Sequence, residues 1–170
     1  MNRPIRAVFL CLYFMKYQQL TKEQFLALHK EFAEFLATQQ IDAKEWDKIK
    51  SENPSMAEEE LNIFSDVVWE DVLTKTEYLE HISENHINLF KRESDNIVRI
   101  YIKLNDENKS FLNEANFQWF LKNPLDKDFE YFKAEKKYTK DHNQELFELI
   151  EMGSQISKGE LFEAINQLIA

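Results

Sequence analysis

Glycine is almost missing from this chain, whose 170 residues include only Gly153 and Gly159. Loops that cradle phosphate groups need glycines where the backbone approaches the ligand or adopts a positive φ angle. The spacing of these two glycines fits neither a P-loop nor a dinucleotide-binding fingerprint, and Glu160 stands where a P-loop has lysine. The sequence therefore excludes nucleotide binding through either motif.

Cysteine occurs once, at Cys11. A lone cysteine excludes intrachain disulfides and zinc sites built from several cysteines, and its apolar neighbours indicate an unreactive thiol. The apolar run at residues 7–15 follows two arginines as in a secretory signal, but it lacks a small-residue cleavage site. It is also shorter than the ~20 residues that cross a bilayer. We therefore expect a cytoplasmic protein with no membrane partner.

Met15 is an alternative start of the protein, which would make residues 1–14 an N-terminal extension. The remaining residues, 15–170, have the length of one globular domain, which at this size buries ~70 % of the surface of the unfolded chain. We expect that domain to have one hydrophobic core.

Basic residues are in the minority, with 21 lysines and arginines against 31 acidic residues and a net charge of -10. A negative chain repels nucleic acid phosphates and attracts basic surfaces. No nucleic acid partner is expected, and a basic protein partner is favoured.

Capping patterns and apolar spacing predict helices in the first half of the chain. Thr21 with Gln24 opens a helix that reaches about Gln39, and a second helix starts at Asp42 and ends before Pro54. Residues 55–82 then read as one long central helix with a continuous apolar face. That face contains Leu61, Phe64, Val68, Val72, Leu79 and Ile82.

The second half of the chain mixes alternating and helical patterns. Residues 87–90 and 97–104 predict a β-hairpin with one buried face, and Phe111 with Leu112 is a candidate third strand. Helices are predicted at 113–122, 141–152 and after a Ser157 cap, whereas 129–138 fits a strand or a helix. The predicted fold is a mostly helical α+β domain with about five helices and a small antiparallel hairpin or three-stranded sheet.

Four carboxylates recur along one side of the predicted long helix, opposite its apolar face. They are Glu59, Asp66, Glu70 and Glu77, and the apolar side chains of Trp69 and Leu73 flank them. This acidic strip is either a solvated helix face or a docking surface for a basic protein or a second copy of the chain.

The histidines offer an alternative function. His81 and His86, together with Glu77, could hold a cation and support an enzyme without a recognisable motif, although histidine is also common at helix C-termini. A di-iron bundle is excluded because Tyr78 and Leu26 stand three residues before His81 and His29, where glutamate would be needed. No cofactor and no catalytic residue are predicted.

The segment at residues 27–81 resembles an uncharacterised family of small acidic bacterial proteins. It reads "ALHKEFAEFLATQQIDAKEWDKIKSENPSMAEEELNIFSDVVWEDVLTKTEYLEH", and the likeness runs from Met15 to the C-terminus. The resemblance implies a bacterial cytoplasmic setting and no activity. The acidic long helix and its flanking aromatic residues lead us to expect a non-enzymatic protein-interaction module with an acidic helix face, with an enzyme that uses carboxylates and His81 around a metal as the alternative.

Overall fold

The computed structural model describes residues 14–170, so Cys11 and nearly all of the expected N-terminal extension lie outside the described residues. The described residues divide into two compact units, 14–71 and 72–170, which we call the helical unit and the sheet unit. The residues that were expected to share one core are thus divided between two units, each with its own apolar cluster.

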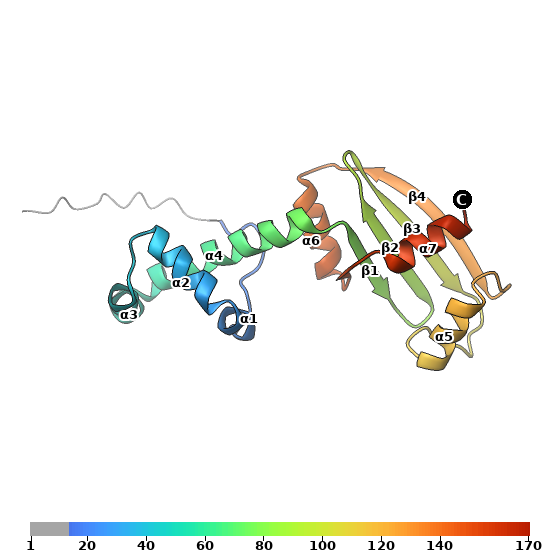
Figure 1. Cartoon of the computed structure of the whole chain (residues 1–170), viewed down its shortest axis with the longest axis horizontal. Helices are drawn as coiled ribbons and strands as arrows, with labels where there is room; N and C mark the ends of the chain where they lie inside the picture. The colour runs from blue at the N-terminus through green and yellow to red at the C-terminus, as the bar shows by residue number, and fades with distance from the viewer. Residues whose placement is uncertain (1–13) are drawn as a thin grey trace, which may run out of the picture. The chain divides into compact units, whose positions relative to one another are not determined.

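Helices α1 (Lys22–Ala27), α2 (His29–Thr38) and α3 (Ala43–Glu52) belong to the helical unit, and α4 (Pro54–Lys75) begins there (Figure 1). The predicted caps are confirmed: Thr21 and Gln24 form a capping box, and the Asp42 side chain accepts a hydrogen bond from the Glu45 amide. The single helix expected from 21 to 39 is wrong. The backbone leaves helical angles at Leu28 (φ -102°, ψ 24°), which separates α1 from α2.

An aromatic cluster holds the helical unit together. The ring of Phe64 on α4 lies 5.0 Å from Phe32, 5.4 Å from Phe35 and 5.9 Å from Phe25, and Trp46 of α3 lies 5.4 Å from Phe32. Aromatic pairs at such distances add to the stabilisation from burial. The apolar spacing of the sequence thus brings α1 and α2 onto one side chain of α4, and α3 joins the cluster through Phe32 of α2.

The long helix ends earlier than predicted. It begins at Pro54, where the Asn53 side chain accepts a hydrogen bond from the Met56 amide, and ends at Lys75. The prediction that it continues to residue 82 is wrong, because Tyr78–Ile82 is strand β1. Leu79 and Ile82 are three residues apart, which suits a helix, but pairing with strands on both sides places them on opposite faces of a sheet. No helix in residues 14–170 is both long and apolar enough to cross a bilayer.

The sheet unit contains an antiparallel sheet in the order β4-β3-β2-β1-β5. Its other strands are β2 (His86–Arg92), β3 (Asn96–Leu104), β4 (Phe129–Lys137) and β5 (Gln155–Ser157). The predicted β2–β3 hairpin and the α+β class are confirmed. The strand at Phe111 and Leu112 is wrong, because these residues lie in a turn. The described residues form seven helices and five strands, more than the predicted five helices and two or three strands.

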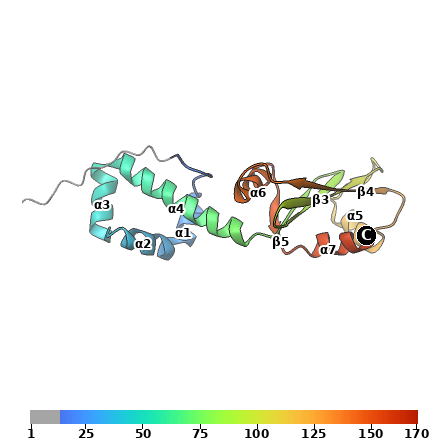
Figure 2. The same cartoon turned by 90° about the horizontal axis from the view of Figure 1, so that it is seen from above.

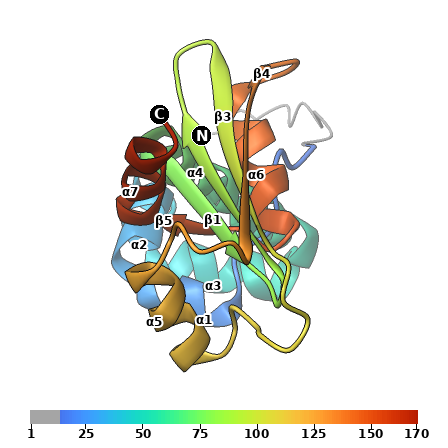
Figure 3. The same cartoon turned by 90° about the vertical axis from the view of Figure 1, so that its right-hand side faces the viewer.

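Three helices cover the sheet unit: α5 (Glu114–Lys122), α6 (His142–Glu151) and α7 (Glu160–Leu168). Figure 2 shows α5 and α7 on one face of the sheet and α6 on the other. Figure 3 shows the same arrangement in a view where the strands run up and down the picture. Asp141 is the N-cap of α6, and α6 lies within the helix predicted at 141–152. The predicted Ser157 cap is wrong, since α7 starts after Gly159, which adopts a left-handed conformation (φ 80°).

The core of the sheet unit lies between the strands and the pair α5 and α7. Alternating residues of β2 and β3 point to that side because successive side chains of a strand face opposite ways. The buried cluster consists of Ile87, Leu89, Val98, Ile100, Ile102, Leu104, Phe111, Phe120, Phe129, Phe162 and Ile165.

Candidate functional site

Two carboxylates of the predicted acidic strip bind the chain segment that leads into α1. Asp66 is 7 % exposed and accepts hydrogen bonds from the backbone amides of Lys16 (2.6 Å) and Tyr17 (2.9 Å). Glu70 accepts hydrogen bonds from the Lys16 ammonium (2.8 Å) and the Tyr17 hydroxyl (2.5 Å). Burial, followed by the hydrogen bond to Glu70, raises the pKa of Tyr17 to about 12. These two carboxylates therefore stabilise the helical unit.

The other members of the strip are dispersed. The Trp69 indole donates a hydrogen bond to the Gln18 carbonyl (3.1 Å), and Leu73 is fully buried. Glu59 is exposed on α4, whereas Glu77 is exposed beyond the end of that helix. The prediction of one continuous exposed strip on a single helix is therefore wrong. Partner binding through Glu59 or Glu77 stays a prediction.

The histidine candidates lie on neighbouring strands. The rings of His81 on β1 and His86 on β2 are 6.1 Å apart. Burial, together with the positive charges of His81 and Arg99, lowers the pKa of His86. No group of three or more histidine, cysteine, aspartate or glutamate side chains in residues 14–170 is arranged to hold a metal ion. The structure thus does not assemble His81, His86 and Glu77 into a metal site.

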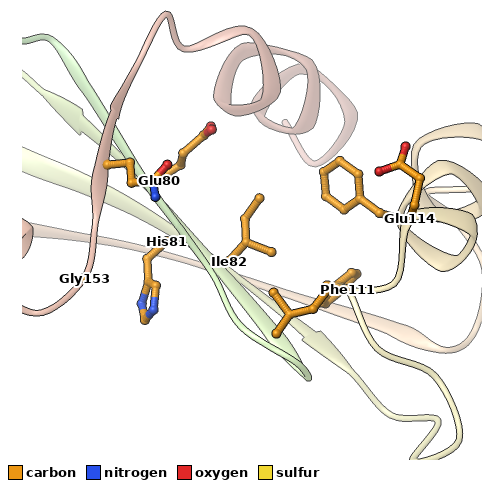
Figure 4. A pocket seen from close by; sticks show the side chains of 9 residues that line it. Glu80, His81, Ile82, Phe111, Glu114 and Gly153 are labelled. Atoms are coloured by element: carbon orange, nitrogen blue, oxygen red, sulfur yellow. The ribbon is translucent and has the colours of Figure 1, made fainter.

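A groove of about 670 Å³ is lined by residues of α5, α7, β1 and β5. A second hollow of about 330 Å³ shares Glu80, Ile82 and Phe117 with it. Figure 4 shows this second hollow, where Glu80 and His81 point to opposite sides of β1. We call the combined hollow the α5–α7 groove.

Apolar residues from four elements line the α5–α7 groove. They are Ile82 of β1, Phe117 and Leu121 of α5, Ile156 of β5 and Leu161 of α7. Leu121 is 43 % exposed and Ile156 is 48 % exposed. Single exposed apolar residues are common on protein surfaces, but several that line one hollow indicate a binding surface.

An open strand edge borders the groove. β5 pairs only with Tyr78, Leu79 and Glu80, although β1 continues through His81 and Ile82. Within residues 14–170, the backbone of these last two residues therefore has no strand on its β5 side. Such an edge offers amide and carbonyl groups to another extended segment.

The charges at the α5–α7 groove are mostly negative. Glu80, Glu114 and Glu160 line it, and Lys158 is the lysine among its lining residues. The three carboxylates come from β1, α5 and α7, so they surround the apolar side chains on several sides. The groove therefore favours positively charged ligands.

A half-buried contact fixes the α7 wall of the groove. The Tyr78 hydroxyl and the Lys91 ammonium each donate a 2.7 Å hydrogen bond to Glu163 of α7. The hydrogen bonds from Lys91 and Tyr78 lower the pKa of Glu163. Above the Tyr78 ring, Gly159 has no side chain, and a Cβ there would approach the ring to 2.5 Å. The start of α7 is thus tied to β1 and β2.

Sequence reasoning missed the groove residues. Phe117, Leu121 and Ile156 are apolar residues without a motif, and the three come together only through the sheet order and the positions of α5 and β5. The signal in the sequence was Leu121, an apolar residue near the end of the predicted helix at 113–122. In the structure this residue remains exposed.

The chain belongs to a family of unknown function (DUF6495), whose model matches residues 15–170. No curated protein and no solved structure gives a significant match to the chain. The family confirms the resemblance found in the sequence and assigns no activity.

Proposed function

We propose that this member of a family without an assigned activity is a protein-binding module that holds a short extended segment of a partner in the α5–α7 groove. The observation that carries the proposal is the combination of exposed Leu121 in an apolar hollow with the open edge of β1 beside it. Peptide recognition by strand addition uses these two components: the edge supplies hydrogen bonds, and the side-chain pockets supply specificity.

The chemistry of the groove selects the partner. Glu80, Glu114 and Glu160 favour a segment that carries lysine or arginine beside its apolar residues. The net charge of -10 would increase the association rate of such a partner at low ionic strength. We place this interaction in a bacterial cytoplasm, a compartment supported by the lone cysteine.

Site-specific photo-crosslinking tests the proposal. A benzophenone side chain introduced at Leu121 or at Ala164, an exposed groove residue of α7, should yield one discrete adduct in cells that produce the protein. The same probe at Leu125, which is strongly exposed but does not line the groove, should yield none. An adduct of twice the chain mass would identify a second copy as the occupant. Equal labelling at Leu125 would contradict the proposal.

Charge variants provide a second readout. With the probe at Ala164, Leu121→Asp should abolish the adduct, and Glu160→Lys should weaken it. Glu107→Lys changes the net charge equally at an exposed turn outside the groove and serves as the matched control. If Glu107→Lys weakens the adduct as much as Glu160→Lys, the acidic side chains of the groove have no specific role.

A further inference from the structure

The sheet has a second exposed surface, on the face opposite α5 and α7. Register places Asn88 of β2, Tyr101 of β3 and Phe132 of β4 side by side there, with His81 of β1 at the end of the row. The core residues of the same strands point to the other face, because side chains alternate along a strand. Residues of α6 line a pocket on this surface together with Phe90, Ile97 and Arg99, toward the other end of the strands.

Four aromatic rings form a chain across this surface. The His81 and His86 rings lie 6.1 Å apart, those of His86 and Tyr101 5.6 Å apart, and those of Tyr101 and Phe132 6.0 Å apart. Phe132 is 54 % exposed. We call these four residues the aromatic row. The rings of His81, His86 and Tyr101 are half-buried, so each presents part of its surface to solvent beside exposed Phe132. Partly exposed rings on neighbouring strands can stack with planar ligand groups.

Positive charge accompanies the aromatic row, in contrast to the negative net charge of the chain. The Arg99 guanidinium lies 5.3 Å from the Tyr101 ring and donates a 2.9 Å hydrogen bond to the side chain of buried Asn88. Lys103 lies opposite His86 in the register. Among residues 14–170, neither Arg99 nor Lys103 forms an ion pair within 4.0 Å.

One carboxylate lies on the same face. Glu130 is opposite Lys103 in the register, and its side chain accepts a 2.9 Å hydrogen bond from Asn105. Around the aromatic row the strands therefore carry Arg99, Lys103, two histidines and Glu130. Lys136, Glu145 and Glu148 line the pocket that Arg99 shares with α6. The pKa of His86 is lowered by burial and then by the charges of His81 and Arg99, which is the direction expected where the local potential is positive.

We propose that the aromatic row with Arg99 and Lys103 binds a short single strand of nucleic acid, whose bases stack on Tyr101 and Phe132 and whose phosphates meet the two cations. Flat sheet surfaces with exposed rings and flanking cations suit unpaired bases, because every base has a planar face. The net charge led us to expect no nucleic acid partner, but the acidic residues of the α5–α7 groove lie on the other face of the sheet. This inference is independent of the proposed groove function.

Fluorescence anisotropy with the full chain tests the inference, using labelled oligo(U) and oligo(dT) twelve-mers at 50 mM salt. We expect saturable binding, with Tyr101→Ala and Phe132→Ala each weakening it about tenfold. Leu125→Ala, which truncates an exposed apolar residue elsewhere in the sheet unit, should leave the Kd unchanged. Tighter binding of oligo(U) would identify RNA as the ligand, and tighter binding of oligo(dT) would identify DNA.

The charge contribution has its own matched pair. Lys103→Glu should lower the slope of log Kd against log salt by about 0.7, the value for one phosphate contact on a single strand. Lys127→Glu makes the same charge change at an exposed turn and should leave the slope unchanged. The inference is overturned if neither oligonucleotide binds at 100 µM protein, or if both lysine variants weaken binding equally. It is also overturned if Phe132→Ala dissociates a dimer in sedimentation experiments without affecting anisotropy, since the surface would then be a protein interface.

Discussion

Glu145 lies buried in the first turn of α6 and illustrates how single residues stabilise the sheet unit. Its carboxylate accepts hydrogen bonds from the Thr139 amide (2.6 Å), the Thr139 hydroxyl (2.9 Å) and the Lys136 ammonium (3.0 Å). Burial alone would raise the pKa of Glu145, but these hydrogen bonds outweigh it and lower the pKa from 4.5 to about 2. The ionised form is therefore the one that the fold favours.

The lowered pKa predicts a pH-dependent contribution to stability. Because the pKa is lower in the folded than in the unfolded state, the contribution is complete above about pH 4.5 and is lost as the pH falls toward 2. Glu145→Gln should lower the free energy of unfolding at pH 7 by about 1–3 kcal/mol. In urea unfolding at pH 7, 4.5 and 3, the difference in the free energy of unfolding between wild type and Glu145→Gln should be smallest at pH 3. Glu151→Gln, exposed on the same helix, is the control, and a difference that is constant with pH would contradict the assignment.

Gly159 supports a second prediction at the same scale. Its φ of +80° strains any L side chain, and an added Cβ would lie 2.5 Å from the Tyr78 ring. Gly159→Ala should therefore lower the free energy of unfolding by about 2–4 kcal/mol. Gly153→Ala should cost less, because Gly153 also has a positive φ but its Cβ would meet only His81 at an ordinary 3.5 Å. Thermal unfolding of both variants tests whether Gly159→Ala lowers stability more than Gly153→Ala does. If both variants lose the same stability, the Tyr78 contact is excluded as the cause.

At the level of elements, Asp66 on α4 connects that helix to residues 16 and 17 through two backbone amides. Asp66→Ala should lower the free energy of unfolding by about 1–3 kcal/mol and increase hydrogen exchange at the Lys16 and Tyr17 amides, which would lose their acceptor. Glu59→Ala, on the exposed side of the same helix, should change neither quantity. Unchanged exchange in Asp66→Ala would contradict the structural role of this carboxylate.

Elements with strong local signals could be predicted from the sequence. The β2–β3 hairpin alternates clearly, and Thr21 and Asp42 are good capping residues ahead of apolar spacing. β1 could not be predicted, because Leu79 and Ile82 also suit the helical stripe of α4 and only pairing with β2 and β5 decides between the two structures. β5 has three residues, too few to carry a pattern. The groove depended on those two strands, and so it was missed.

At the level of the whole molecule, the net charge of -10 opposes the compact state through repulsion among carboxylates. Added salt screens this repulsion over a Debye length of about 10 Å at 0.1 M. Raising sodium chloride from 20 to 200 mM should therefore increase Tm by about 1–3 °C. The double variant Glu107→Lys and Glu151→Lys, both at exposed positions, should show a smaller increase. A decrease in Tm would indicate that attractive ion pairs dominate.

The two borders of the sheet differ in what they can accept. β4 is a nine-residue border strand, exposed from Phe132 onward, and it carries Lys133, Glu135, Lys136 and Lys137. Dense charge on a border strand discourages another chain from extending the sheet there. At the opposite border, β5 is only three residues long and β1 leaves a short open stretch. If a guest strand joins this border, sheet growth should stop after that one strand, so the expected complex has one guest per chain and does not extend into a fibril.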